Sequence, residues 1–267
     1  MDIETALNQI VSVVGLRGLM QGADADRYLQ DERGLFHGEA ALVVKPASVA
    51  ECSQIIAIAQ ESGIGVIPQG GNTGYCGGAT SFDSKRQIIL NLSRMNNVRE
   101  VDPVNFTMTV EAGMILTAAH TVAQNHGLMF PLSMGSQGSC QIGGVLSTNA
   151  GGISVLRYGS ARDLVLGIEV VLPNGELLSE LKGLRKDNTG YDLKGLFVGA
   201  EGTLGVITAA VLRLFPEPRN RQIALLGVTT PQAACDFLAR VRKDSGEQVV
   251  SAEYISRESL DIVLDQI

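Results

Sequence analysis

The stretch Val66-Ile67-Pro68-Gln69-Gly70-Gly71-Asn72-Thr73-Gly74-Tyr75-Cys76-Gly77-Gly78 is a short apolar run that ends in a proline and continues into a loop with five glycines in nine residues. Glycine adopts positive φ without penalty and lets another atom approach the backbone closely. Successive N–H groups in such a loop can point into one concavity and bind an anion. We interpret the stretch as a strand followed by a loop that holds the diphosphate of a nucleotide cofactor. A mobile surface loop is the alternative.

The composition sets the class of protein. The chain has 267 residues, of which 45% are hydrophobic and 18% are charged, which is typical of a globular protein with one large or two smaller domains. The net charge of −7, with no basic stripe to offset it, argues against nucleic acid as a partner. No run of about 18 apolar residues is present, so no transmembrane segment is expected.

The cysteine pattern and the N-terminal sequence indicate the cellular compartment of the protein. The four cysteines form no C-x-x-C pair, and with three histidines a zinc cluster within this chain is not expected. A reducing compartment is the natural interpretation of this cysteine pattern. The start, Met1-Asp2-Ile3-Glu4, is acidic and resembles neither a signal peptide nor an Arg-rich transit peptide. We expect a cytoplasmic protein.

A β-α-β unit precedes the glycine loop. Residues 41–44 form an apolar run, Ser48 and Glu51 have the spacing of a capping box, and the following helix should end near Gly63. The glycine loop then lies at the C-terminal end of the second strand, where ligands bind in such units. Apolar residues at helical spacing between Ile3 and Val14 predict an N-terminal helix, and residues 22–38 are interpreted as loop.

The middle of the chain carries further strands and one helix. Residues 88–92 and 107–112 read as strands, with a polar turn between them, and a helix is expected around 115–125. His120 and His126 do not share a helix face well. We interpret both as ordinary helix histidines, because no partner for catalysis or metal binding is supplied by the spacing.

A second glycine system lies between Gly135 and Gly152, in which small residues and hydroxyls dominate. A flat, partly polar ring could lie against such a surface. A tightly packed helix with small-residue contacts explains the same composition equally well, and both interpretations stay open at this point.

The last third of the chain divides at a pair of prolines. Residues 163–172 predict a strand, Pro173-Asn174-Gly175 a hairpin turn, residues 185–192 a loop, and residues 206–214 a strand that Pro216 and Pro218 close. We expect strands at 222–228 and 249–255, a helix at 231–242, and an apolar helix face from Leu260 to Ile267. That face suggests the start of an incomplete second domain.

The absence of two common nucleotide-binding motifs narrows the choice of cofactor. No G-x-G-x-x-G opens a helix after a strand and no G-x-x-x-x-G-K-[ST] occurs, so the usual NAD fingerprint and the Walker loop are disfavoured. A third glycine segment, residues 199–205, joins the two already described. A large dinucleotide with a flat ring suits three such segments, and FAD is the natural candidate.

Five motifs occur in register: residues 68–74, 138–144, 148–152, 157–159 and 202–205. Together they resemble the FAD-binding domain of the vanillyl-alcohol oxidase/PCMH flavoprotein family. Residues 185–194 are most similar to the branch with D-2-hydroxyglutarate dehydrogenase, cytochrome-type D-lactate dehydrogenase and the glycolate oxidase flavoprotein subunit. The resemblance implies an α+β fold of two α/β subdomains with FAD between them. The domains would be residues 1–37 as lead-in, 38–217 as the PCMH-type domain, and 218–267 as the start of a cap domain.

The resemblance also assigns roles. Residues 70–74 would hold the diphosphate, residues 135–144 would line the ribityl and diphosphate path, residues 148–151 would lie near the isoalloxazine, and Glu201, Gly202 and Ile207 would contact the adenosine side. The residues assigned to cofactor binding are Pro68, Gln69, Gly70, Gly71, Asn72, Thr73, Gly74, Gly78, Gly135, Ser136, Gly138, Ser139, Gly143, Gly144, Thr148, Asn149, Ala150, Gly151, Gly159, Glu201, Gly202 and Ile207. Some members attach FAD through a histidine in the glycine loop, where this chain has Asn72, so we expect non-covalent FAD.

The implied reaction is oxidation of a D-2-hydroxy acid by hydride transfer to flavin N5. The catalytic base and a His-x-His metal site are expected beyond Ile267, with no metal ligands in this chain. The electron acceptor would be an electron-transfer flavoprotein, a cytochrome or a quinone, and a homodimer is left open. Two alternatives are an FAD-binding electron-transfer subunit of a multi-component oxidoreductase and a non-catalytic nucleotide-binding module whose glycines serve packing only.

Overall fold

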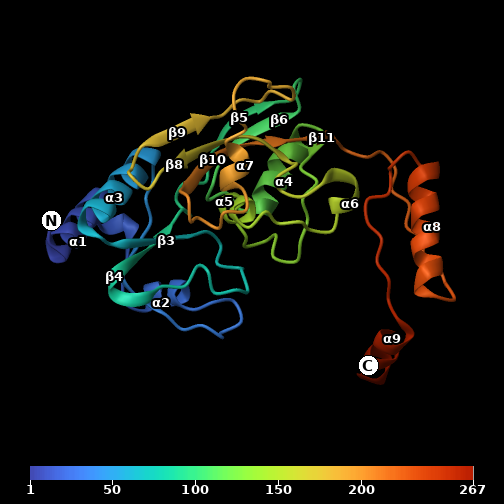
Figure 1. Cartoon of the computed structure of the whole chain (residues 1–267), viewed down its shortest axis with the longest axis horizontal. Coiled ribbons are helices and arrows are strands. Elements are labelled where there is room, and N and C mark those ends of the chain that lie inside the picture. The colour runs from blue at the N-terminus through green and yellow to red at the C-terminus, as the bar shows by residue number, and fades with distance from the viewer. Residues whose placement is uncertain (267) are drawn as a thin grey trace.

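Parallel strands near the N-terminus form the first sheet of the computed structural model, which describes residues 1–266 (Figure 1). Its strand order is β1-β2-β4-β3, with bounds β1 Leu19–Met20, β2 Glu39–Val44, β4 Phe82–Asn91 and β3 Gly65–Gln69. β2 and β3 both pair in parallel with β4, which lies between them. The carboxyl ends of these three strands therefore meet at one edge.

The two faces of this sheet are covered by different helices, as the alternation of side chains along a strand requires. Val44 of β2 and Ile88 of β4 belong to the main core, together with buried residues of helices α1 (Ile3–Gly18) and α3 (Val49–Ser62). Their neighbours Val43 and Ile89 point to the other face. There they pack against Tyr28 of helix α2 (Ala23–Leu29).

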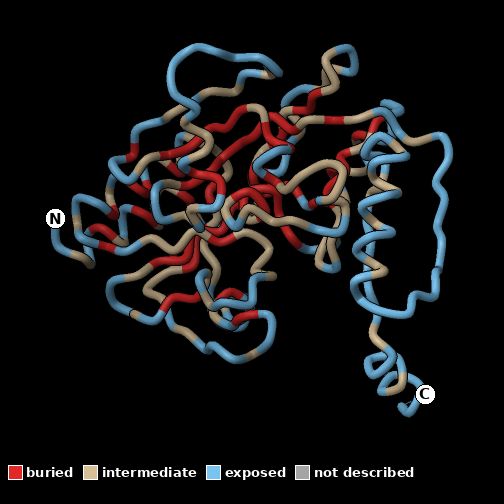
Figure 2. The backbone as a smooth tube through the Cα atoms, turned by 45° about the vertical axis from the view of Figure 1, so that its right-hand side comes forward, coloured by how far each residue is buried: buried red, intermediate tan, exposed pale blue. Residues whose placement is uncertain are grey.

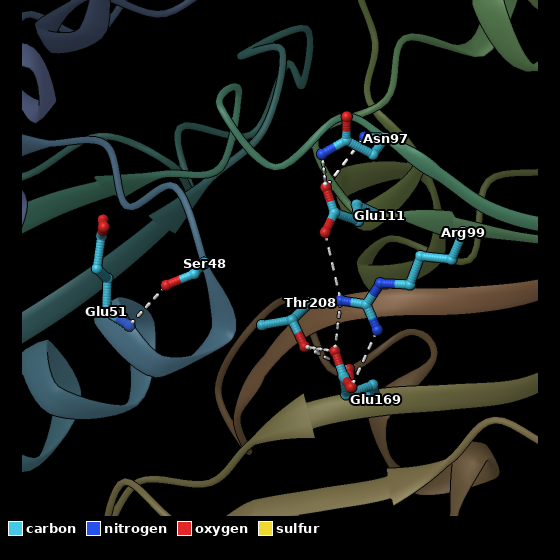
Figure 3. A network of polar contacts seen from close by, with 7 residues as sticks. All are labelled: Ser48, Glu51, Asn97, Arg99, Glu111, Glu169 and Thr208. Atoms are coloured by element: carbon cyan, nitrogen blue, oxygen red, sulfur yellow. Dashed lines mark hydrogen bonds and ion pairs between the residues drawn. The ribbon is translucent and has the colours of Figure 1, made fainter.

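Helix α3 begins and ends as its sequence predicts. The Ser48 hydroxyl accepts a hydrogen bond from the Glu51 backbone N–H at 3.1 Å (Figure 3). The Glu51 carboxylate accepts from the N–H of Ala47 at 2.7 Å, one residue earlier than in the usual capping box. Gly63 ends the helix in the left-handed conformation with φ 67°.

The second sheet is antiparallel and has the strand order β5-β6-β10-β8-β9. Its bounds are β5 Val98–Asp102, β6 Thr107–Glu111, β10 Val206–Arg213, β8 Val165–Val171 and β9 Leu177–Glu180. The central strand β10 is buried at every residue from Val206 to Leu212. The remaining elements of this half are α4 Leu116–Asn125, β7 Leu128–Met129, α5 Ile142–Ser147, α6 Val155–Tyr158, α7 Lys194–Phe197 and β11 Phe215–Pro216, with β7 and β11 paired.

Helix α3 also joins the two sheets. The Ser53 hydroxyl donates to the carbonyl of Gly175 in the β8–β9 turn at 2.5 Å, and Gly175 has φ 82°, as the predicted hairpin turn requires. A Cβ at Gly175 would lie 2.8 Å from that of Ala57. Burial, with a smaller effect of the charge on Glu169 of β8, raises the pKa of the Cys52 thiol to about 12. The turn and the helix therefore approach each other closely.

A buried carboxylate ties four strands of the second sheet together (Figure 3). Glu169 of β8 has a side chain only 8% exposed, accepts from both terminal nitrogens of Arg99 of β5 at 3.0 and 3.1 Å, and accepts from the Thr208 hydroxyl of β10 at 2.8 Å. Arg99 also reaches Glu111 of β6 at 3.5 Å. Burial acts to lower the pKa of Arg99, but hydrogen bonds and charges of Glu169 and Glu111 outweigh it and raise that pKa.

Residues 218–266 lie apart from this body. Helices α8 (Pro231–Asp244) and α9 (Arg257–Gln266) contain no buried residue, and the segment extends from the end of β11 away from both sheets (Figures 1 and 2). Large apolar side chains are exposed along it, including Ile223 at 98% and Leu225 at 96%. The division into residues 38–217 and 218–267 stays a prediction.

The expected α+β fold is confirmed, and four local predictions are wrong. Residues 22–38 contain helix α2, because Tyr28 and Leu29 give a polar segment an apolar contact with the sheet. The turn before residue 107 contains strand β5, which β6 pairs. Residues 222–228 and 249–255 are not strands, because no neighbouring strand within residues 1–266 bonds their backbone. Ile267, the end of the predicted apolar face, lies outside the described residues.

Replacing Glu169 by alanine should destabilise the protein by roughly 2–3 kcal/mol, because Arg99 and the Thr208 hydroxyl would lose their shared buried partner. Glu100→Ala is the matched control, since Glu100 is exposed on β5 beside Arg99, and it should change the free energy of unfolding by less than about 0.5 kcal/mol. Urea unfolding measures both. Equal stability of the two variants would contradict the role given to the buried network.

Candidate cofactor site

The base of the glycine loop is fixed by two buried amide side chains. Gln69, at the end of β3, donates through Nε2 to the carbonyls of Tyr28 at 2.9 Å and Ala79 at 3.0 Å. Asn91, at the end of β4, donates through Nδ2 to the carbonyl of Gly70 at 2.8 Å. Both ends of the loop are therefore bonded to the rigid sheet.

The loop meets the second glycine system directly. A side chain at Gly71 would overlap the carbonyl oxygen of Ser139, and a Cβ at Gly70 would lie 3.5 Å from the backbone nitrogen of Gly144 in α5. Glycine at position 71 is required by this approach of two backbones. The structure thus brings together segments that are some seventy residues apart in sequence.

The third glycine segment closes against the same strand end. A Cβ at Gly202 would lie 3.0 Å from the ring of Pro68, and one at Gly78 would lie 3.5 Å from the Glu201 carboxylate. The Glu201 N–H donates at 2.8 Å to the carbonyl of Ser147, the last residue of α5. All three glycine segments therefore surround one place, the carboxyl end of β3.

A turn after α2 supports the outer side of the loop. Asn72, which has φ 53°, donates through Nδ2 to the carbonyl of Gln30 at 2.7 Å. The Arg33 guanidinium lies 4.0 Å from the centre of the Tyr75 ring. The turn itself is held by Asp31, and hydrogen bonds from the N–H groups of Phe36 and then Arg33 lower the pKa of that carboxyl.

The glycines of the site fall into two groups. Some are needed for packing, as Gly71 is, and a side chain at Gly143 would meet the Cβ of Ala112 at 2.8 Å. Others have open space where a Cβ would be: nothing lies within 4 Å at Gly74, Gly135 or Gly138. Packing alone does not explain this second group. A surface of bare backbone beside the loop fits a ligand that approaches the main chain closely, as a dinucleotide diphosphate does.

Several of the other expected site residues make contacts within the protein. The Thr148 hydroxyl donates to the carbonyl of Gly144 at 3.0 Å, and the Asn149 side chain accepts from the N–H of Arg162 at 3.0 Å. Ile207 is 3% exposed within β10. Gly159 packs against Asp163 rather than facing open space. These contacts give the four residues structural roles, and their roles toward FAD stay predictions, as do those of Ala150 and Gly151.

A cavity of about 370 Å³ lies beside the loop and includes residues that the sequence did not single out. It is bounded by α2, by the carboxyl ends of β2, β3 and β4, and by Gln141 at the start of α5. The lining residues missed from the sequence are Arg27, Tyr28, Lys45, Asn91, Ser93 and Gln141. A usable signal existed for half of them. Lys45, Asn91 and Ser93 end or follow strands parallel to β3, so the rule that located the glycine loop locates them too.

His120 of α4 and His126, which follows that helix, make contacts within their own neighbourhood. The Nε2 atom of His120 lies 2.8 Å from the carbonyl of Leu132, and Nδ1 of His126 lies 2.9 Å from that of Val122. Burial lowers the pKa of His120. Across residues 1–266, no cluster of three His, Cys, Asp or Glu side chains suited to a metal ion is found, and no helix has the length and apolar character needed to cross a bilayer.

Comparison with known families shows the family to which this chain belongs. Residues 40–179 match the family described as "FAD binding domain", which is more than half of the chain. The chain belongs to the FAD-binding domain family. The match covers the glycine loop, the second glycine system and most of both sheets, while Glu201 and Gly202 lie beyond it.

Curated relatives extend the similarity along the chain. D-2-hydroxyglutarate–pyruvate transhydrogenase DLD3 of Saccharomyces cerevisiae is 39% identical over 89% of this chain and 48% of its own length. The mitochondrial D-2-hydroxyglutarate dehydrogenase of Bos taurus is 42% identical over 85% of this chain and 41% of its own. A putative D-lactate dehydrogenase of Schizosaccharomyces pombe is 38% identical over 93% and 47%. The chain spans about half the length of the curated relatives it matches.

Solved structures support the fold. An alkyldihydroxyacetonephosphate synthase superposes with a TM-score of 0.73 at 22% identity, over 82% of this chain and 42% of that one. A variant of Phl p 4, described as a glucose oxidase, gives a TM-score of 0.67 at 20% identity, over 80% and 44%. The fold of this chain is thus shared with these two proteins.

The two groups of glycines should respond differently to valine. Gly138→Val should raise the dissociation constant for FAD by roughly tenfold or more and shift Tm by less than about 2 °C, because its side chain would enter open space beside the loop. Gly71→Val should instead lower Tm strongly, because its side chain would overlap backbone. Flavin fluorescence titration and thermal unfolding measure the two effects. Unchanged FAD affinity in Gly138→Val would contradict the assignment of the open glycines.

Proposed function

We propose that this chain is the FAD-binding part of an enzyme that oxidises a D-2-hydroxy acid of the D-2-hydroxyglutarate, D-lactate or glycolate class. One observation carries the proposal: three separate glycine segments meet at the carboxyl end of β3, and the first two leave backbone facing open space at Gly74, Gly135 and Gly138. The family match supports FAD as the ligand of this surface, and the names of the relatives support the substrate class.

In this proposal each segment binds a different portion of FAD. The N–H groups of residues 70–74 bind the diphosphate, residues 135–144 line the ribityl path, residues 148–151 lie toward the isoalloxazine, and residues 201–207 contact the adenosine. Bound FAD supplies a hydride acceptor. The chain's own contribution is to orient the cofactor and to shield one side of it from water.

Attachment of FAD is non-covalent in this proposal. Linkage to flavin needs a nucleophilic side chain, and Asn72 offers a carboxamide whose nitrogen is already bonded to the carbonyl of Gln30. The prediction is that acid or urea denaturation releases all flavin into the filtrate of a size-cutoff membrane. Flavin fluorescence that stays with the protein band on a denaturing gel would contradict it.

The substrate site is assigned chiefly to the part of the relatives' length that this chain does not span. Oxidation of a 2-hydroxy acid needs a base for the hydroxyl proton and cations for the carboxylate. His120 and His126 are bonded to backbone carbonyls, and the base is expected beyond Ile267, as is any divalent metal. The electron acceptor is proposed to be an electron-transfer flavoprotein, a cytochrome or a quinone.

Four free cysteines support a reducing compartment, for which we propose the cytoplasm, although several relatives are named mitochondrial. A homodimer is compatible with this proposal.

The substrate class can be tested on the protein as its gene encodes it. Anaerobic addition of D-2-hydroxyglutarate, D-lactate or glycolate should bleach the oxidised flavin spectrum for at least one of the three, whereas the L-enantiomers of the first two should not. Bleaching by none of them, together with reduction by a purified redox partner, would contradict the proposal and favour an electron-transfer subunit.

A further inference from the structure

The cavity beside the glycine loop is positively charged. Two cationic side chains, Arg27 of α2 and Lys45 after β2, line it, and none of its lining residues is acidic. Neither cation has a carboxylate within ion-pair distance among residues 1–266. By contrast, Arg99 pairs with Glu169, and Arg162 donates to the carbonyl of Gly195. The hollow beside the glycine loop therefore holds two cations without an acidic partner among its lining residues.

Both cations are positioned by one aromatic ring. The guanidinium of Arg27 lies 4.8 Å from the centre of the Tyr28 ring and donates to the Tyr28 hydroxyl at 2.7 Å. The Lys45 ammonium lies 5.9 Å from the same ring centre. Tyr28 is 7% exposed and packs on Val43 and Ile89, so the ring is fixed by the sheet. The two charges are thus held near each other despite their mutual repulsion.

Two buried polar atoms at this cavity have no partner. The Gln141 carbonyl oxygen Oε1 and the Ser93 hydroxyl are both enclosed and form no hydrogen bond within residues 1–266. Gln141 is 7% exposed, and its Oε1 lies 3.6 Å from the position of a Cβ at Gly70. Burying a polar group without a partner is costly. Because Oε1 is an acceptor only, its missing partner must be a donor.

These features describe the ligand. It carries anionic oxygens for Arg27 and Lys45 and a hydroxyl for Gln141, and it lies against the backbone of residues 70–72. The glycine loop itself, residues 68–78, contains no Lys or Arg, so its N–H groups provide only partial positive charge. FAD joins a diphosphate of about two negative charges to hydroxylated sugar chains on both sides.

We propose that Arg27 and Lys45 neutralise the diphosphate of FAD and that Gln141 Oε1 accepts a hydrogen bond from a sugar hydroxyl next to it. This inference rests on the proposed function, since it concerns the same cofactor. It assigns the full charges of the site to α2 and to the end of β2, elements that the glycine motifs do not include.

The test is the dissociation constant for FAD of the full chain, measured by flavin fluorescence at low and high salt. Arg27→Gln and Lys45→Gln should each weaken binding roughly tenfold, and the double variant roughly a hundredfold. The difference from wild type should shrink at high salt, because screening weakens charge pairs. Arg86→Gln is the matched control, since Arg86 is exposed in the middle of β4 and does not line the cavity, and it should leave the affinity unchanged.

Two further measurements separate binding from folding. ADP, which keeps the diphosphate, should lose affinity in the double variant by a factor close to that for FAD. Gln141→Leu should weaken FAD binding several-fold while leaving Tm of the FAD-free protein equal or higher, because it removes an unpaired buried oxygen. A purely structural Gln141 would give a lower Tm instead.

The outcomes distinguish FAD binding by the chain from the roles given to Arg27 and Lys45. Failure of the wild-type chain to bind FAD would overturn the proposed function. Wild-type binding with unchanged affinity in the double variant would overturn only the present inference. Binding of inorganic pyrophosphate without competition against FAD would also overturn it, since the cavity would then hold a separate anion.

Discussion

The approach of the Gly71 backbone to the Ser139 carbonyl is the constraint on which the rest of the structure depends. No side chain fits at residue 71, so the loop after β3 and the segment before α5 can meet only because glycine stands there. This meeting brings the first sheet, at the carboxyl ends of its parallel strands, to the antiparallel second sheet. Gly202 then closes against Pro68, and the three glycine segments become one surface. Without this close contact, the open glycines at positions 74, 135 and 138 would belong to unrelated loops.

The body around this edge is stiff for reasons that do not involve the cofactor. Glu169 binds Arg99 and Thr208 within the second sheet, and α3 joins that sheet to the first through Ser53 and Gly175. A ligand surface made largely of backbone needs such support, because bare main chain has no side chains with which to adjust its shape. Rigid surroundings let several N–H groups face one ligand at little entropic cost on binding.

Most of the fold could be predicted from periodicity and turn chemistry. The capping box at Ser48, the hairpin turn at Gly175 and the strand at 206–214 were all readable, because each depends on local residues. Helix α2 was not, since its short polar sequence is helical only by virtue of Tyr28 packing on a sheet. Residues 222–228 and 249–255 have strand composition but no bonding partner within residues 1–266, which composition cannot reveal. For the site, motif spacing located the glycines. It missed Arg27 and Gln141, because their proximity arises from different elements meeting at one edge, whereas the position of Lys45 after β2 was a usable signal.

The central claim, that three glycine segments form one FAD cradle, is tested most directly by hydrogen–deuterium exchange of the chain with and without added FAD. Backbone N–H groups that bind a ligand, or lie beneath one, exchange more slowly. The account predicts slower exchange on FAD addition in residues 70–74, 135–144 and 199–205 together, with the helices α8 and α9 unchanged. Protection of one segment without the other two, or no protection in any of them, would contradict it.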